Sequence, residues 1–204
     1  MTIGQRRRRE REQRRRAILD SAKRLFLHEG FDKTSVEDIA ASAELAKGTV
    51  YLYFDGKEDI YVSIVEELME EVARQQLKMV AKASPEEALT RLGLSMIRDF
   101  SRNKMLCDLA HRNIAMVQKS LSPELKQRMQ MLFHKQFEMF VEQFKRGKES
   151  GNFKIKDAEA LARVFIAFLH GLLPMMRGGE AAQAAEQAAS LGIRTFLAGC
   201  ARPS

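Results

Sequence analysis

The segment AKGTVYLYF gathers side chains that could bind an anionic polymer. Lys47 can donate hydrogen bonds to phosphate or to guanine, Gly48 permits a close backbone approach, and Thr49 offers a methyl and a hydroxyl group to bases. Tyr51 and Tyr53 end in hydroxyl groups that can donate to phosphate oxygens. A tyrosine taken alone is more often half-buried than functional, so the meaning of the segment depends on the element that carries it.

This segment, residues 46–54, includes an unbroken run of residues that favour β-strands, from Thr49 to Phe54. The flanking sequence is rich in Glu, Ala, Lys and Leu, which favour helices. A strand here would find no partner, because the rest of the chain carries no other strand signal, and its backbone groups would stay unpaired. The run therefore predicts a short helix, with Val50 and Phe54 stacked one turn apart on its buried side.

Two helices are predicted before this segment. The first starts within the Arg-rich beginning of the chain and runs to about Glu29, where Gly30 ends it. The second opens at Thr34, which can form a capping box with Glu37. A long helix followed by two short helices with a tight connection is typical of a helix-turn-helix unit, whose last helix lies in the major groove of DNA.

The next helix is predicted from about Lys57 to Lys82, with Asp55 as its cap and Glu58 as the reciprocal partner of that cap. Lys57 would lie where the free N–H groups of the helix start also attract phosphate. Start and stop signals then predict five further helices, which begin at about residues 85, 104, 123, 157 and 181.

Composition agrees with an all-α fold. The 204 residues are 45% hydrophobic and 30% charged, with four Pro and no Trp, so the chain can build a helical core. About nine helices are expected. They would form a three-helix helix-turn-helix domain with an Arg-rich arm, residues 1–60, joined by the long helix to a larger helical domain, residues 61–204.

The sequence favours a cytoplasmic protein that does not enter membranes. Cys107 and Cys200 are the only cysteines, and both lie in apolar, helix-like sequence, which indicates a reducing compartment without a disulfide. The start, MTIGQRRRRE, lacks the apolar stretch of a signal peptide. The run VFIAFLHGLLPMM is too short for a membrane span and contains Pro174.

Net charge is +7 and is unevenly distributed. Residues 1–16 hold eight Arg and two Glu, a balance of +6, whereas residues 17–60 hold five basic and nine acidic residues, a balance of −4. We therefore expect the arm to bind phosphates, to dominate the salt dependence of DNA binding and to be able to enter a minor groove. A solvated charge run or contact with anionic lipid stays open as an alternative. The arm begins with Arg6, Arg7, Arg8 and Arg9.

The stretch KTSVEDIAASAELAKGTVYLYFDGKEDIYVSIV, residues 33–65, resembles the DNA-binding domain of TetR-family transcriptional regulators. The shared pattern is a Thr at the second helix, then Ile-Ala, a turn, and Gly-Thr-Val-Tyr-x-Tyr-Phe followed by a Lys. The resemblance covers residues 17 to about 65, and beyond them it extends only to the number and length of the helices. It implies a homodimer that binds double-stranded DNA at a palindromic operator, with a larger domain that dimerises and binds a small molecule.

Position by position, the resemblance implies two sets of DNA contacts. The residues that would face the groove are Lys47, Gly48, Thr49 and Leu52. The residues that would contact phosphate are Thr34, Ser35, Tyr51, Tyr53 and Lys57.

Two positions depart from the family pattern. Glu44 stands in the turn where the family usually has Gly, and Ala46 stands where it often has Ser. Glu44 is expected to carry backbone strain, because the turn favours a positive φ. Ala46 forgoes a side-chain cap worth about 0.5–2 kcal/mol. Both changes predict a recognition helix that is less stable by itself.

Met and Phe are abundant in the larger domain, where they suit both a packed core and an adaptable cavity. For any one of them the two interpretations stay equally open. A cavity would favour an apolar or cationic-aromatic molecule, with polar contacts from Asp99, Asn103, His111, Asn113 and Gln136. The candidate ligand-binding residues are Met96, Phe100, Met105, His111, Met116, Phe137, Phe140 and Phe168.

The last two helices are the candidates for a dimer interface, because they could pack as a four-helix face across a two-fold axis. The alternative is that the same residues close the core of one protomer. The predicted interface residues are Phe165, Leu169, Leu172, Leu191, Arg194, Phe196 and Leu197.

No enzymatic site is predicted. The sequence shows no nucleophile with a base, no metal-ligand spacing among its four His and no phosphate-binding loop, so neither a cofactor nor a metal is expected. The function that the sequence favours is a sequence-specific DNA-binding transcriptional regulator, a repressor that a small, largely apolar ligand releases from a palindromic operator. The rival interpretation is a helical small-molecule-binding protein or enzyme whose N-terminal unit is structural.

Overall fold

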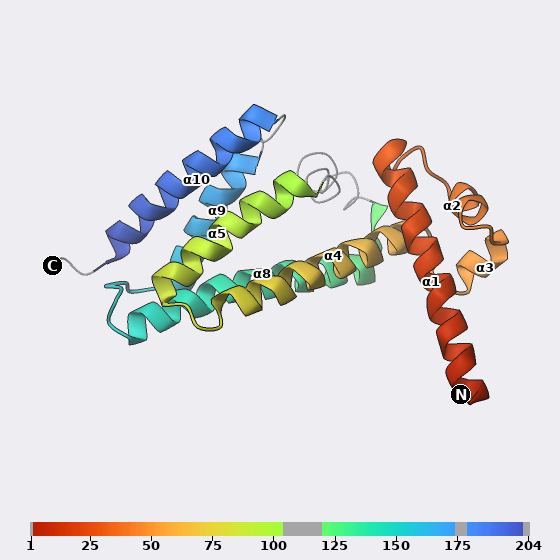
Figure 1. Ribbon diagram of the computed structural model, residues 1–204, viewed down its shortest axis with the longest axis horizontal. Helices are drawn as coiled ribbons and strands as arrows, with labels where there is room; N and C mark the ends of the chain where they lie inside the picture. Colours follow the sequence, from red (N-terminus) through yellow and green to blue (C-terminus); the bar gives the residue numbers. More distant parts are fainter. Residues whose placement is uncertain (1, 104–119, 174–178, 202–204) are drawn as a thin grey trace. The chain divides into compact units, whose positions relative to one another are not determined.

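The computed structural model describes residues 2–103, 120–173 and 179–201 (Figure 1). Within them the chain forms eight helices and no strand, which confirms the all-α prediction. The helix expected at about residues 104–118 lies outside the described residues. The chain folds as two compact units, the first drawn from residues 1–68 and 119–129, and the second from residues 69–118 and 130–204.

The first unit contains α1 (Ile3–His28), α2 (Val36–Ser42), α3 (Lys47–Tyr51) and the beginning of α4 (Lys57–Val80). In Figure 1, α2 and α3 lie beside the second half of α1, and the first half of α1 continues past them. The core is aliphatic and aromatic, with each helix contributing at least one fully buried side chain. Among these are Ile18, Ile39, Val50 and Ile60.

The strand-favouring run forms no strand, as predicted, but only residues 49–51 of it lie in α3, which is 5 residues long; Leu52, Tyr53 and Phe54 lie beyond the helix end. Val50 is fully buried and Phe54 is 3% exposed, so the two side chains anchor the helix on the core. The chain leaves the helix after Tyr51, and the N–H group of Phe54 still donates to the Val50 carbonyl at 3.1 Å.

The connection between α2 and α3 confirms both expectations about it. Glu44 has a φ of 55°, the left-handed conformation that the family pattern reserves for Gly. Ala46 is the N-cap of α3 and makes no side-chain capping hydrogen bond. The short helix therefore depends on packing rather than on its own ends.

The predicted cap of α2 is wrong by one residue. Ser35, rather than Thr34, is the N-cap, and Asp38, rather than Glu37, completes the capping box. The reason is that Thr34 is buried and its hydroxyl donates to the Gly30 carbonyl at 2.9 Å, so it cannot serve the helix start.

The cap of α4 shows the same displacement. The helix begins at Lys57 as expected, but the backbone N–H group of Asp55 donates to Asp59, at 3.2 Å, rather than to Glu58. Gly56 precedes the first helical residue and brings no side-chain acceptor, so the carboxylate one residue further along takes the reciprocal position.

The second unit contains the rest of α4, α5 (Pro85–Arg102), most of α8 (Pro123–Glu149), α9 (Ala158–Leu172) and α10 (Gly179–Cys200). Helix α10 packs against α5 and α9. The core is centred on aromatic rings in mutual contact, with Phe165 lying 5.8 Å from Phe140, 5.8 Å from Phe144 and 5.2 Å from Phe196 between ring centroids.

Two features of the second unit follow from sequence. Ser84 caps α5 in a box with Glu87, as the SPEE signal predicts. No helix of the described residues is both long and apolar enough to cross a membrane.

Replacement of Glu44 by Gly is expected to raise the free energy of unfolding by about 1 kcal/mol. The left-handed conformation costs a non-glycine residue roughly 1–2 kcal/mol, which the replacement by Gly would relieve. Gly also gives the unfolded chain more conformational freedom, and this offsets about 0.4–1 kcal/mol of the stabilisation. Chemical denaturation of the full chain measures the change. As a control, Ala43→Gly should destabilise, since Ala43 has a φ of −89°; equal effects at the two positions would show that Glu44 is unstrained.

Candidate nucleic-acid interface and ligand cavity

Helix α3 presents its unburied residues to solvent. Leu52 is 76% exposed and Tyr51 is 47% exposed, while Lys47 and Gly48 are also exposed. A Cβ atom added to Gly48 would meet nothing within 4 Å, so glycine is not required there for packing within the chain. Exposed Lys and Tyr side chains beside a glycine form a surface that could donate hydrogen bonds to phosphates or base edges.

Lys47 is held by a residue of α2. Its ammonium group forms an ion pair with Glu37, and it lies 5.9 Å from the ring centroid of Tyr51. The hydrogen bond between the two side chains lowers the pKa of Glu37 and raises the pKa of Lys47. Both side chains are about half-exposed, so an incoming anion can compete for the ammonium group. Sequence reasoning missed this pair, since the two residues lie in different helices.

Arginines of α1 lie against the segment that follows α3. The guanidinium of Arg11 lies 5.9 Å from the ring centroid of Tyr53, and that of Arg15 lies 5.5 Å from the ring centroid of Phe54. Arg15 also donates to Glu67 at 2.7 Å. Tyr53 is therefore half-buried and already has a cationic neighbour.

The Arg-rich arm is part of a continuous helix. Helix α1 starts at Ile3, so Arg6, Arg7, Arg8 and Arg9 are helical and exposed. Arg6 donates to Glu10 at 3.0 Å. A helix with side chains is about 10–12 Å wide, whereas the minor groove is about 6 Å wide, so the expectation that the arm enters a minor groove does not fit this conformation.

The polar groups of the residues expected at the start of α2 and α4 are bonded within the protein. The Lys57 ammonium group donates to the carbonyls of Phe31, Asp32 and Thr34, at 3.0, 3.4 and 3.1 Å, and lies 4.6 Å from the ring centroid of Phe31. Ser35 is partly exposed and its hydroxyl is engaged in the capping box. Lys57 thus fixes the connection that leads into α2.

A cluster that sequence reasoning missed joins the start of α8 to α4. Arg128 donates to Asp59 at 2.6 Å, to Ser63 at 3.1 Å and to Glu66 at 2.5 Å. The hydrogen bond to Glu66 raises the pKa of Arg128, which therefore stays charged. More than sixty positions separate Arg128 from its partners, and no local signal in the sequence could have revealed the contact.

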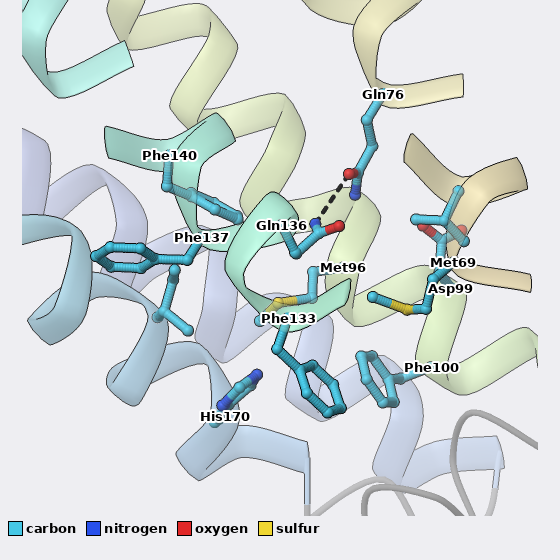
Figure 2. Close-up of a pocket in the computed structure, with 12 residues that line it drawn as sticks. Met69, Gln76, Met96, Asp99, Phe100, Phe133, Gln136, Phe137, Phe140 and His170 are labelled. Atoms are coloured by element: carbon cyan, nitrogen blue, oxygen red, sulfur yellow. Dashed lines mark hydrogen bonds between the residues drawn. The ribbon is translucent and has the colours of Figure 1, made fainter. Parts of the chain in front are cut away.

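The second unit contains a cavity of about 250 Å³ lined by α4, α5, α8 and α9. Four of the predicted ligand-binding residues line it: Met96, Phe100, Phe137 and Phe140 (Figure 2). Residues that sequence reasoning missed are Met69, Val72, Gln76, Phe133, Ile166 and His170. The sequence indicated only that Val72 lies on an apolar face of α4, and an apolar helix face is also typical of a packed core.

The other predicted ligand-binding residues are placed elsewhere or cannot be placed. Phe168 does not line the cavity; its ring covers Gly192, where a Cβ atom would lie 2.1 Å from it. Met105, His111, Met116 and Asn113 lie outside the described residues.

The polar groups on the cavity wall are two amides, a carboxyl group and an imidazole. Gln76 and Gln136 are hydrogen-bonded to each other at 2.9 Å, and Asp99 and His170 complete the set (Figure 2). Partial burial lowers the pKa of His170, although the residue remains exposed to solvent. No Lys or Arg is among the described residues that line this cavity.

Three of the seven predicted dimer residues are buried within one protomer. Phe165 and Leu169 are fully buried and Leu197 is 2% exposed, all within the core of the second unit. Phe196 and Leu172 are partly buried against the same core. For these side chains the structure favours the alternative of closing the core of one protomer, because an apolar stripe on a helix faces the nearest core first. Leu191, at 61%, and Arg194 are exposed.

Comparison with known proteins matches both parts of the chain. Residues 18–64 match the family described as bacterial regulatory proteins, tetR family, and residues 103–201 match the QacR-like protein C-terminal region. The fatty acid metabolism regulator protein of Bacillus subtilis is 35% identical over 85 residues, a match that spans 41% of this chain and only 42% of that relative.

Two further matches agree with this assignment. The biofilm operon icaADBC HTH-type negative transcriptional regulator IcaR of Staphylococcus epidermidis is 41% identical over 49 residues, 24% of this chain and 26% of that protein. The crystal structure of the TetR-family regulator PfmR from Thermus thermophilus superposes with a TM-score of 0.70 at 28% identity, covering 92% of this chain and 97% of the other. A helix-turn-helix with an exposed recognition helix and matches along both parts of the chain make this protein a DNA-binding transcriptional regulator of the TetR family.

Proposed function

We propose that this regulator is a dimeric repressor that binds a palindromic operator and is released from it by a small, largely apolar ligand. The observation that carries the DNA-binding part is the exposed face of α3, fixed to the core by Val50 and Phe54. Lys47, Thr49 and Leu52 would contact base edges from this face. The relative named as a negative transcriptional regulator supports repression as the outcome.

Phosphate contacts would come from three places. Tyr51 and Tyr53 bracket the end of α3, where their hydroxyl groups can donate to the backbone of the duplex. The Arg-rich beginning of α1 would lie along phosphates as a helix. Thr34 and Lys57 would contribute by holding the start of α2 in place, because their polar groups already bond within the protein.

A second copy of the chain would cover small and apolar residues that α9 and α10 leave exposed. On α9 these residues recur at the spacing of one helix face, and Val164 among them is 55% exposed. On α10 the face includes Leu191. Small side chains allow two helices to approach closely, which suits a four-helix interface across a two-fold axis. The exposed residues are Ala160, Val164, Ala167, Gly171, Ala184, Leu191 and Ala198.

Ligand release would act through α4. This helix begins in the DNA-binding unit at Lys57 and supplies Met69, Val72 and Gln76 to the cavity. An occupant that favours one position of α4 shifts the population of conformers, and the separation of the two recognition helices of the dimer shifts with it. Operator affinity falls when the separation departs from about one turn of DNA, roughly 34–36 Å.

Selection from randomised duplexes is expected to recover a palindrome, and Lys47→Met should weaken binding to it about 5- to 150-fold for each half-site, the effect of removing one base interaction worth about 1–3 kcal/mol from each protomer. Fluorescence anisotropy with the selected and a scrambled duplex at equal salt measures the effect. Lys33→Met, at an exposed position before α2, serves as the control. Equal affinity of the unmodified protein for both duplexes would contradict sequence-specific binding.

Glu37→Gln should strengthen operator binding several-fold, because it frees Lys47 from its ion pair. The log K against log[salt] slope should also steepen, because each protomer brings one negative charge fewer to the duplex. Glu29→Gln, also exposed and acidic, should leave the slope unchanged. If Glu37→Gln strengthened operator binding equally in a Lys47→Met background, the increase in affinity would not depend on Lys47.

Replacement of Arg6, Arg7, Arg8 and Arg9 by Gln should flatten the salt slope by about three to four units per protomer, at roughly 0.9 for each phosphate that is no longer neutralised. Gln favours helices, so α1 should keep its length, which circular dichroism checks. A slope change below about one unit would show that the arm contributes little. The control replaces by Gln four exposed Lys of the second unit: Lys135, Lys145, Lys154 and Lys156.

A further inference from the structure

A directed chain of hydrogen bonds runs from the cavity wall into the second unit. The Gln136 amide donates to the Gln76 side-chain oxygen at 2.9 Å, and the Gln76 amide donates to the Ser95 hydroxyl at 2.9 Å. The Ser95 hydroxyl in turn donates to the Leu92 carbonyl at 3.0 Å. Gln136 and Gln76 line the cavity, whereas Ser95 does not. Each member therefore donates to the one behind it, starting from the cavity.

The side-chain amide of Gln76 or Gln136 cannot be reversed by itself without breaking this series of hydrogen bonds. Gln76 is 1% exposed and Ser95 is 7% exposed, so a reversed amide would bring two donors or two acceptors together without water to separate them. With the chain in this direction, the Gln136 side-chain oxygen accepts no hydrogen bond from the described residues. Figure 2 shows this oxygen turned away from Gln76. The wall thus offers an occupant an acceptor.

The remaining polar groups are poorly suited to an anion. Asp99 adds a carboxyl group to the wall, and no Lys or Arg is among the described residues that line the cavity. Arg163 lies 5.0 Å from the ring centroid of Phe137, but it does not line the cavity and is paired with Glu159. A carboxylate buried among these groups would lose its hydration without gaining a cationic partner from the described wall, which is costly.

We propose that the occupant is an apolar molecule that ends in a hydrogen-bond donor, a hydroxyl or a protonated amine, with the donor directed at the Gln136 oxygen. The rings of Phe100, Phe133 and Phe140 would enclose the apolar part. A carboxylate of the same length would be rejected. This inference rests on the proposed ligand-responsive function and names the chemistry that the cavity accepts.

Calorimetry with the full-length protein and three probes of one chain length, decan-1-ol, decylamine and decanoate, tests the proposal. The alcohol or the amine should bind at least tenfold more tightly than decanoate. Comparison of the alcohol with the amine shows whether a positive charge on the donor increases the affinity. In Gln136→Met the preference over decanoate should fall below threefold, while Gln130→Met, at an exposed position of the same helix, should retain it.

The outcomes separate this inference from the proposed function. Equal or tighter binding of decanoate to the unmodified protein would overturn the inference, and so would failure of both the alcohol and the amine to bind; neither result needs a variant that folds. Binding of a donor probe that left operator affinity unchanged would support the inference and overturn ligand release. Operator release by the donor probes and not by decanoate would support both.

Discussion

The burial of Val50 and Phe54 is the constraint on which the DNA-reading surface depends. A helix of 5 residues without a side-chain cap is far too short to be stable in water by itself. Its shape comes from two side chains inserted in the core of the first unit, and every exposed group of α3 takes its position from them. The strained turn at Glu44 shows how strongly this packing acts, since it holds a non-glycine residue in a left-handed conformation.

Around Val50 and Phe54, the charged groups of Lys57 and Arg128 stabilise the fold by bonding to oxygen atoms within the protein. Lys57 donates hydrogen bonds to three carbonyls of the loop before α2, and Arg128 donates to a hydroxyl and two carboxylates of α4. Both cations sit where backbone or carboxylate oxygens would otherwise face one another. Four consecutive arginines, Arg6 to Arg9, are exposed at the beginning of α1, a part of the helix that continues past α2 and α3 (Figure 1).

Sequence reasoning succeeded where local physics decides the outcome. The helix at residues 47–51, the left-handed Glu44 and the Ser84 cap follow from patterns within a few residues of each other. It failed by one residue at the starts of α2 and α4, where overlapping cap signals compete and tertiary burial of Thr34 decides between them. Apolar periodicity predicted α9 and α10 correctly as helices, but it does not distinguish a face that packs in the core from one that binds a second protomer. The Glu37–Lys47 pair and the Arg128 cluster join distant segments, and one sequence holds no trace of such contacts.

The two hydrogen-bonded links between α4 and α8 limit how either helix can move. Arg128 ties α8 to the first part of α4, and Gln136 ties α8 to Gln76 further along the same helix. Within the first unit, a displacement of α4 relative to α8 must break the contacts of Arg128, and within the second unit it must break the hydrogen bond between Gln136 and Gln76. In each unit, a shift of the two helices together costs none of these bonds.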